Sequence, residues 1–474
     1  MSETRKVDVL VIGGGPAGMK GAIQAAKEGR DVLLVEREPA LGGECVNRGT
    51  IPSKTLRETA VYLANLRQRS AGLFDAELRS DIKVASLMKR LTTVVDHLRE
   101  YLGNQVARNG IRRLQGMARF VSPEEVELVS PTGEKITISA DIIMVATGTR
   151  PRTPPEVPVD HEHILDSDSI LSLIYLPTSM TVLGAGVIAC EYATLFAALG
   201  VEVLMVEKRD RPLGFLDREL TDHFVESFER AGGRFIPNAS VESVHWDGVS
   251  RVITKLADGE ILRTEKMLCA LGRVASVRTL APEKAGVEMT DRGLIRVDET
   301  FTTTNPRVIA VGDVIGPPAL ATTAMFQGRK AMRHALGLPA ENCSECAPIG
   351  IYTVPEIGCV GMREEDAIEA HGGCIVGHAP FQELARAHIS GNTEGFLKLV
   401  CDPAGRKILG VHAVGEGATD LVHIAQIAIA AGLEVDAFLE NVFNFPTLAE
   451  AYCVAAIDVI GQRTRLEEAA SAAA

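Results

Sequence analysis

Two glycine-rich segments of this chain have the spacing that dinucleotide binding requires. One reads Gly-Gly-Gly-Pro-Ala-Gly over residues 13–18, and the other reads Gly-Ala-Gly-Val-Ile-Ala over residues 184–189. In such a segment the first glycine permits a tight turn, the second lets the backbone approach a pyrophosphate, and a third small residue packs a helix on a strand. The free N–H groups at the start of that helix face the anion. These roles fall to Gly13, Gly15 and Gly18 in the first segment, and to Gly184, Gly186 and Ala189 in the second.

An acidic residue follows each segment at the same distance. Glu36 lies 23 positions after Gly13, and Glu207 lies 23 positions after Gly184. A carboxylate at the end of the next strand accepts hydrogen bonds from the ribose diol of a dinucleotide. A single glycine motif is weak evidence, but both segments carry their acid, so the two units together predict two bound dinucleotides.

Strands and helices of the expected lengths surround these residues. Short apolar runs lie before each glycine segment and before each acid, at residues 7–12, 180–183, 31–35 and 201–206. They predict buried parallel strands, each pair joined by a helix. Two more apolar runs end in Thr147-Gly148 and in Gly312-Asp313, and they predict two further buried strands.

The rest of the sequence predicts further helices and strands of an α/β protein. Apolar residues at helical spacing within residues 81–113 predict long helices that flank the core. From about residue 346 the pattern changes to strands at 395–400 and 408–412, followed by a helix rich in Ala and Ile at 418–431. His412 and His423 in this part are expected to be packing residues.

Composition narrows the class of protein. The 474 residues predict about three domains. The formal net charge of -13 disfavours nucleic acid as a partner. We expect no signal peptide and no membrane span, and the nine scattered cysteines favour a reducing cytoplasm. The Cys343-x-x-Cys346 pair is weak evidence for metal or redox chemistry.

Residues 42–54 read Gly-Gly-Glu-Cys-Val-Asn-Arg-Gly-Thr-Ile-Pro-Ser-Lys. They resemble the redox loop of the flavoprotein disulfide reductases, the family of lipoamide dehydrogenase and glutathione reductase, in which two cysteines five residues apart precede Ile-Pro-Ser-Lys. Cys45 matches the first cysteine, but Thr50 stands in place of the second. A threonine hydroxyl forms no disulfide and has no accessible anion near neutral pH. The resemblance therefore implies a flavin site without its dithiol relay.

A second functional residue of the family, a histidine near the C-terminus, is also absent from this chain. Residues 443–450 resemble the C-terminal His-Pro-Thr motif of this family, with Phe445 where the histidine would be. A phenyl ring exchanges no proton, so this position performs no acid–base chemistry for a dithiol. Val187 stands where some members place a tyrosine that covers the flavin, which implies that a side chain at this position restricts access to the flavin only weakly.

The resemblance also implies which residues form the site. Lys54 and Glu191 match the family's ion pair beside flavin N5, where a lysine stabilises charge on the ring. The residues implied for FAD are Gly13, Gly15, Gly18, Glu36, Arg37, Gly43, Cys45, Thr50, Lys54, Ala118, Thr147, Gly148, Gly312 and Asp313. Those implied for NAD or NADP are Gly184, Gly186, Ala189, Glu207, Lys208, Arg209 and Gly272. No metal ligand is implied.

The expected fold is α/β, with two nested Rossmann-like dinucleotide-binding domains and an α+β C-terminal dimerisation domain. The expected boundaries are residues 1–155 and 275–345 for the FAD-binding domain, 156–274 for the NAD(P)-binding domain, 346–465 for the dimerisation domain and 466–474 for a disordered tail. Dimerisation implies a homodimer or a higher homo-oligomer.

Within the family, the Gly-Thr-Ile-Pro-Ser-Lys run and residues 209–217 most resemble the soluble, Si-specific NAD(P)+ transhydrogenases. This implies hydride exchange between NADPH and NAD through FAD. Three alternatives stay open at this point. They are a flavin NAD(P)H dehydrogenase that reduces quinones or dyes, a peroxidase that uses Cys45 as a lone sulfenic acid, and a binding subunit without activity.

Overall fold

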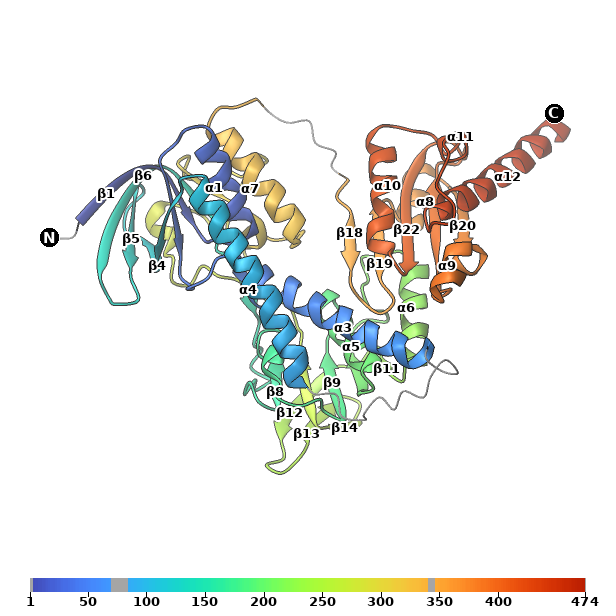
Figure 1. The fold of residues 1–474 in the computed structure, drawn as a ribbon, viewed down its shortest axis with the longest axis horizontal. Coiled ribbons are helices and arrows are strands. Elements are labelled where there is room, and N and C mark those ends of the chain that lie inside the picture. Colours follow the sequence, from blue (N-terminus) through green and yellow to red (C-terminus); the bar gives the residue numbers. More distant parts are fainter. Residues whose placement is uncertain (1–2, 70–83, 340–345, 474) are drawn as a thin grey trace.

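The computed structural model of the chain describes residues 3–69, 84–339 and 346–473. Figure 1 shows three lobes, which are the first nucleotide unit, the second nucleotide unit and a C-terminal unit built on its own sheet. This arrangement confirms the expected α/β fold class with two dinucleotide-binding folds and a separate α+β unit. In the described part of the chain, no helix is both long and apolar enough to cross a membrane.

A seven-stranded sheet carries the first nucleotide unit. Its strands are β1 (Glu3–Ile12), β2 (Val32–Glu36), β3 (Arg112–Gln115), β4 (Met117–Phe120), β5 (Glu125–Val129), β6 (Lys135–Val145) and β17 (Val308–Ala310). β3, β2, β1 and β6 are parallel neighbours, and β17 joins the C-terminal end of β6. All residues of β2 are buried, as expected of an apolar run in a covered parallel sheet.

Helices α1 (Pro16–Lys27) and α7 (Ala321–Ala335) pack side by side against this sheet (Figure 1). Their approach is close because Gly328 has no side chain. A Cβ added at Gly328 would lie 2.1 Å from the carbonyl oxygen of Ala17. The start of α1 lies next to the segment that contains Asp313, because a Cβ added at Gly312 would lie 3.3 Å from the Cβ of Ala17.

The redox-loop segment is helical. α2 (Gly43–Asn47) contains Cys45, and α3 (Thr50–Arg69) begins at Thr50 and contains Lys54. α4 (Val84–Arg108) lies within the segment 81–113 that is expected to form long helices, and it packs against α3. α3 also packs against α5 (Val187–Ala198) of the second nucleotide unit, which brings Lys54 to that unit.

The second nucleotide unit contains a five-stranded parallel sheet. Its strands are β8 (Ile164–Asp166), β9 (Ser179–Leu183), β10 (Glu202–Val206), β11 (Arg234–Ile236) and β15 (Lys266–Cys269), in the order β11-β10-β9-β15-β8. An antiparallel sheet of β12 (Val241–Trp246), β13 (Val252–Leu256) and β14 (Ile261–Thr264) packs beside it, and α6 (Arg218–Arg230) follows β10. The chain passes between the two units through the antiparallel strands β7 (Thr149–Pro151) and β16 (Arg273–Ala275).

The C-terminal unit is an antiparallel sheet covered by helices. Its strands are β18 (Ile349–Ile351), β19 (Ile357–Gly361), β20 (Ile375–Pro380), β21 (Gly395–Cys401) and β22 (Ile408–Gly415). α10 (Ala418–Ala430) packs on β19 and β22, and α12 (Glu450–Ala473) packs on β20 and β21. The shorter helices are α8 (Glu364–His371), α9 (Ala385–Ser390) and α11 (Ala437–Glu440).

The expected disordered tail is wrong in its described part. α12 continues to Ala473, so residues 466–473 are helical and project beyond the sheet (Figure 1). The reason is propensity, because this segment contains only Leu, Glu, Ala and Ser, most of which favour a helix that packing has already started.

Candidate active site

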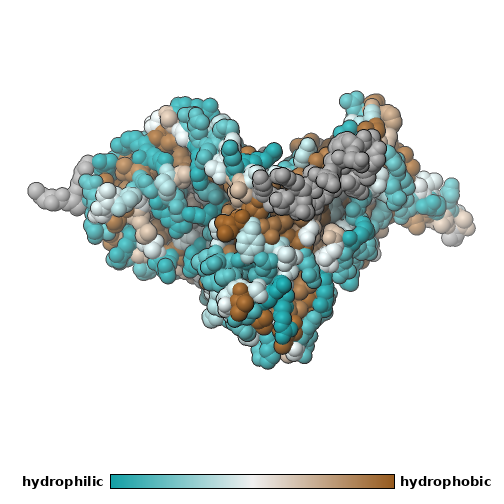
Figure 2. Space-filling view, turned by 60° about the horizontal axis from the view of Figure 1, so that its bottom comes forward, coloured by the Kyte–Doolittle hydropathy of each residue, from teal (hydrophilic) through white to brown (hydrophobic). Residues whose placement is uncertain are grey.

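A cavity of about 1090 Å³ lies where the two nucleotide units and the C-terminal unit meet. This volume is at the upper end of what one small ligand occupies, so the cavity has room for more than one. Both glycine turns, the α2–α3 segment and the residues around β18 form its wall. Figure 2 shows hydrophobic residues toward the middle of one face, where the lobes meet.

The first glycine of each motif is required by the fold of its turn. Gly13 and Gly184 have φ values of 110° and 98°, in the left-handed region. A Cβ on Gly13 would lie 2.3 Å from the carbonyl oxygen of Ala146, and one on Gly184 would lie 2.8 Å from that of Ala270. Any side chain would therefore collide with the neighbouring strand end in both units.

The second glycine of each motif leaves room for a ligand. Gly15 and Gly186 precede α1 and α5, and neither helix start has a side-chain cap. A Cβ on Gly186 would meet nothing within 4 Å, and one on Gly15 would meet only Gly43, at 3.7 Å. The uncapped N–H groups thus face open space in the cavity, which fits the pyrophosphates of two dinucleotides, FAD included.

The third position of each motif serves packing. Gly18 and Ala189 are absent from the cavity wall. A Cβ on Gly18 would lie 1.9 Å from the oxygen of Gly13, and Ala189 is fully buried. Both residues let the helix pack against the strand, and neither faces a ligand.

The two acids hold their own turns in place. Glu36 accepts hydrogen bonds from the N–H of Gly14 at 2.7 Å and from the N–H of Glu38 at 2.9 Å. Glu207 accepts one from Ala185 at 2.8 Å and one from the residue two positions after itself at 3.1 Å. Since each carboxylate oxygen has a second lone pair, both acids keep acceptor capacity for a ribose hydroxyl.

Lys54 and Glu191 meet in the cavity wall. Lys54 Nζ lies 2.5 Å from Glu191 Oε2, and it also lies 5.1 Å from the centre of the Tyr352 ring. The other oxygen of Glu191 accepts a hydrogen bond from the backbone N–H of Tyr352 at 3.0 Å. The three residues come from α3, α5 and the segment after β18, so this cluster joins all three lobes. Tyr352 has no signal in the sequence that would mark it as part of the site.

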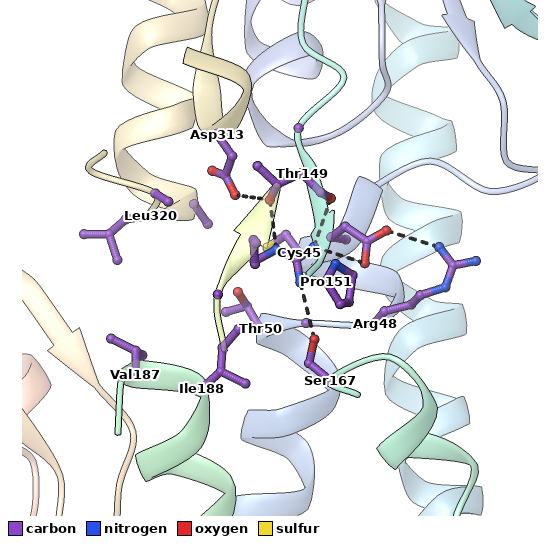
Figure 3. Close-up of a pocket in the computed structure, with 18 of the residues that line it drawn as sticks. Cys45, Arg48, Thr50, Thr149, Pro151, Ser167, Val187, Ile188, Asp313 and Leu320 are labelled. Carbon is purple, nitrogen blue, oxygen red and sulfur yellow. Dashed lines mark hydrogen bonds and ion pairs between the residues drawn. The ribbon is translucent and has the colours of Figure 1, made fainter. Parts of the chain in front are cut away.

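Cys45 and Thr50 are neighbours in the cavity wall (Figure 3). Burial raises the pKa of the Cys45 thiol, and the Thr50 hydroxyl and the Lys54 ammonium offset only part of this shift. The thiol is therefore held in its protonated form near neutral pH, where it is a poor nucleophile.

A hydrogen-bond chain links Asp313 to the second nucleotide unit (Figure 3). The hydroxyl of Thr149 donates to Asp313 Oδ2 at 3.2 Å, and Arg273 Nε donates to the same hydroxyl at 2.8 Å. Arg273 also donates to the carbonyl oxygen of Thr149 at 2.9 Å and to Ser167 at 3.4 Å. The sequence argument missed Arg273, although it directly follows Gly272.

Two carboxylates lie beside this chain. Desolvation raises the pKa of Asp168 to about 6, and the negative charge of Glu44 adds to the shift against the effect of Arg273. Glu44 Oε2 is buried and has no hydrogen-bond partner among the described residues, and it lies 3.8 Å from an Arg273 nitrogen. Neither acid was expected from its position in the sequence.

The cavity wall contains nearly all of the expected site residues. Those that line it are Gly13, Gly15, Glu36, Arg37, Gly43, Cys45, Thr50, Lys54, Ala118, Thr147, Gly148, Gly184, Gly186, Glu191, Glu207, Lys208, Arg209, Gly272, Gly312 and Asp313. They come from segments that are far apart in the chain, and the fold brings them together.

Other residues from the sequence analysis lie elsewhere. Phe445 does not line the cavity of this chain and is 73% exposed. Cys343 lies outside the described residues. His412 is buried, and its Nε2 bonds to the carbonyl oxygen of Met362 at 2.8 Å, as a packing residue would. His423 is instead exposed at the edge of the cavity, so its expected packing role is wrong.

The chain belongs to the pyridine nucleotide-disulphide oxidoreductase family. Residues 7–328 match the pyridine nucleotide-disulphide oxidoreductase domain of this family, and residues 347–456 match its dimerisation domain.

Individual relatives place the chain more narrowly. It is 42% identical to the soluble pyridine nucleotide transhydrogenase of Mycobacterium bovis (strain BCG / Pasteur 1173P2), over 98% of this chain and 99% of that one. It is 37% identical to the soluble pyridine nucleotide transhydrogenase of Escherichia coli O1:K1 / APEC, over 97% and 99%. Among solved structures, LpdA from Mycobacterium tuberculosis aligns with a TM-score of 0.88 and 27% identity, over 95% of this chain and 99% of LpdA.

Proposed function

We propose that this protein is an FAD-dependent, Si-specific NAD(P)+ transhydrogenase that passes a hydride between NADPH and NAD. The observation that carries the proposal is the site itself, in which two dinucleotide folds open into one cavity while Thr50 stands beside Cys45. The two transhydrogenases described above, which are 42% and 37% identical to this chain, support the same activity.

FAD, when bound, would supply the chemistry for hydride exchange between a reduced and an oxidised nicotinamide. The glycine turn at Gly13 and the start of α1 would hold its pyrophosphate, Glu36 its ribose and Asp313 its ribityl chain. We assign residues 1–155 and 275–345 to this FAD-binding domain.

Lys54 supplies a fixed positive charge on the wall of the cavity. Glu191 orients the ammonium group through their 2.5 Å contact and is itself held by the backbone of Tyr352. A preorganised charge of this kind stabilises negative charge that develops beside it at no cost of reorganisation.

The second nucleotide unit would bind the exchanging coenzymes. Gly184, Gly186 and the start of α5 would hold the pyrophosphate, and Glu207 the adenosine ribose. We assign residues 156–274 to this NAD(P)-binding domain. Lys208 and Arg209 are exposed on the wall next to Glu207, where they could neutralise the 2′-phosphate of NADP.

No electron transfer through a dithiol is possible at Cys45 and Thr50. Cys45 has Thr50 as its neighbour and a raised thiol pKa, so it neither forms a disulfide nor presents a thiolate. The raised pKa also argues against the peroxidase alternative, which needs a reactive thiolate at position 45.

Homo-oligomerisation follows from the dimerisation domain, and we propose a homodimer in the cytoplasm. Residues 346–465 would form the interface. Large apolar side chains are exposed on this unit, with Val442 100% and Phe445 73% exposed. Contact with a second copy would remove these apolar side chains from water.

Two measurements test the proposed function. Anaerobic NADPH should bleach a yellow, non-covalently bound flavin, and NAD should restore the colour with release of NADH. Steady-state rates should give parallel double-reciprocal lines, because one coenzyme must leave before the other enters. Intersecting lines, or faster turnover with quinones than with NAD, would show that the enzyme is not primarily a transhydrogenase.

A further inference from the structure

The loop after β10 forms an arc beside the second glycine turn. It begins at Glu207, whose carboxylate accepts a hydrogen bond from Ala185 N–H at 2.8 Å. It returns to the same residue at Leu213, whose N–H donates to the carbonyl oxygen of Ala185 at 2.9 Å. Since both ends of the arc are fixed to the coenzyme turn, the three cations between them, Lys208, Arg209 and Arg211, lie close to the ribose-binding acid.

These cations differ in their surroundings. Lys208 and Arg209 are exposed, so water and salt screen their charges. The side chain of Arg211 is only 19% exposed while it still lines the cavity. A charge that is mostly shielded from water acts more strongly on a bound anion than an exposed one.

The guanidinium group of Arg211 is only partly hydrogen-bonded. Its Nη2 donates to the carbonyl oxygen of Gly214 at 3.2 Å. Its Nη1 is buried and has no hydrogen-bond partner among the described residues, and a buried donor without an acceptor is costly. Its carboxylate neighbour is Glu365, whose Oε1 lies 3.8 Å from Nη1, near enough for an ion pair but beyond hydrogen-bond length.

Glu365 belongs to a different lobe from Arg211. It lies on α8 of the C-terminal unit, is 43% exposed and does not line the cavity. The arc is held against this unit because Asp217, at the start of α6, is fully buried against Lys398 of β21, with their side chains 2.9 Å apart. Arg211 therefore lies between the Glu365 carboxylate and the cavity.

We propose that Glu365 is a specificity-determining residue, which holds Arg211 while the coenzyme has no 2′-phosphate and releases it to a 2′-phosphate. The inference rests on the proposed function, because only an enzyme that takes NAD and NADP at one site needs such a compromise. Without Glu365, the unshared guanidinium would favour the phosphorylated coenzyme and leave NAD unaffected. With Glu365 present, binding of a 2′-phosphate must break the ion pair between Arg211 and Glu365, which offsets part of the favourable binding energy. The affinities for NADP and NAD therefore stay closer to each other.

The test is equilibrium binding of 2′,5′-ADP and 5′-AMP to the FAD-loaded protein, measured by calorimetry without any hydride transfer. Glu365→Gln should tighten 2′,5′-ADP binding by about 2- to 5-fold, the scale of a partly exposed ion pair, and leave 5′-AMP unchanged. Arg211→Met should weaken 2′,5′-ADP binding by about 10-fold or more, the scale of a lost charged hydrogen bond. The matched control is Glu369→Gln, which removes the same charge from an exposed position one turn along α8.

Two results would overturn the inference. One is an equal gain in Glu369→Gln, which would mean that α8 acts only through its net charge. The other is a gain from Glu365→Gln that persists in the Arg211→Met background, which would mean that the two residues are not coupled. Both readouts are independent of hydride transfer, so a failure of this inference can be distinguished from a failure of the proposed function in the kinetic assay.

Discussion

Replacing Lys54 with Met should slow reduction of the bound flavin. Methionine fills a similar volume but has no charge, so the change removes the cation from the cavity wall and leaves the Glu191 carboxylate behind. That carboxylate is 9% exposed and keeps the backbone N–H of Tyr352 as a partner. The fold of the cluster should therefore survive the change.

The magnitude follows from the position of the ammonium group. At the effective dielectric constant of a protein surface, two unit charges ~4 Å apart interact by about 4 kcal/mol. Glu191, 2.5 Å from Lys54, cancels part of this for any third charge. We therefore expect the variant to lose about 2.7 kcal/mol of transition-state stabilisation, similar to the loss of one preorganised electrostatic contact. This loss corresponds to a rate of flavin reduction lowered roughly 10²-fold.

The assay is anaerobic stopped-flow mixing with NADPH, following loss of the flavin absorbance. Lys54→Arg is the control, because it keeps the charge in the same cluster, and its rate should fall much less. The absorbance ratio of flavin to protein verifies that each variant still holds FAD. An unchanged reduction rate in the flavin-loaded methionine variant would refute the reasoning and leave Lys54 a structural role.

Three further predictions concern groups around the site. Cys45→Ser should keep NADPH-to-NAD turnover within a few-fold of wild type, since the thiol has no second cysteine at position 50 with which to form a disulfide, and loss of activity with FAD still bound would contradict an idle Cys45. Lys398→Met should lower the free energy of unfolding by about 3–5 kcal/mol, because it leaves the buried Asp217 carboxylate without its lysine ion-pair partner, whereas adding Asp217→Asn should restore much of the loss. The pKa of Asp168 is raised to about 6 in the folded protein, so its carboxyl costs stability as pH rises from about 4 to about 6. Asp168→Asn should therefore raise the Tm at pH 7.5 and not at pH 4, and an equal rise at both would assign the gain to packing.

The sequence by itself determined the parts of this protein that depend on local spacing. Each glycine turn is specified within six residues, because its φ values and its contacts with the neighbouring strand allow no other residue at the first position. The distance to Glu36 and to Glu207 is fixed because one helix and one strand of set length lie between. The loss of the relay could likewise be predicted from Thr50 alone, because it is a matter of side-chain chemistry.

Only the tertiary structure decided which distant groups meet. Arg211 and Glu365 are ordinary surface-type residues in the sequence, and nothing in their neighbours indicates that α8 packs beside the coenzyme arc. Tyr352 reaches Glu191 across 161 positions, and Lys398 reaches Asp217 across 181. Such pairings depend on how whole sheets and helices pack, and the desolvation that raises the pKa of Asp168 depends on the same packing. Local sequence patterns specify turns and strands, whereas burial and long-range charge pairing exist only once the three units are assembled.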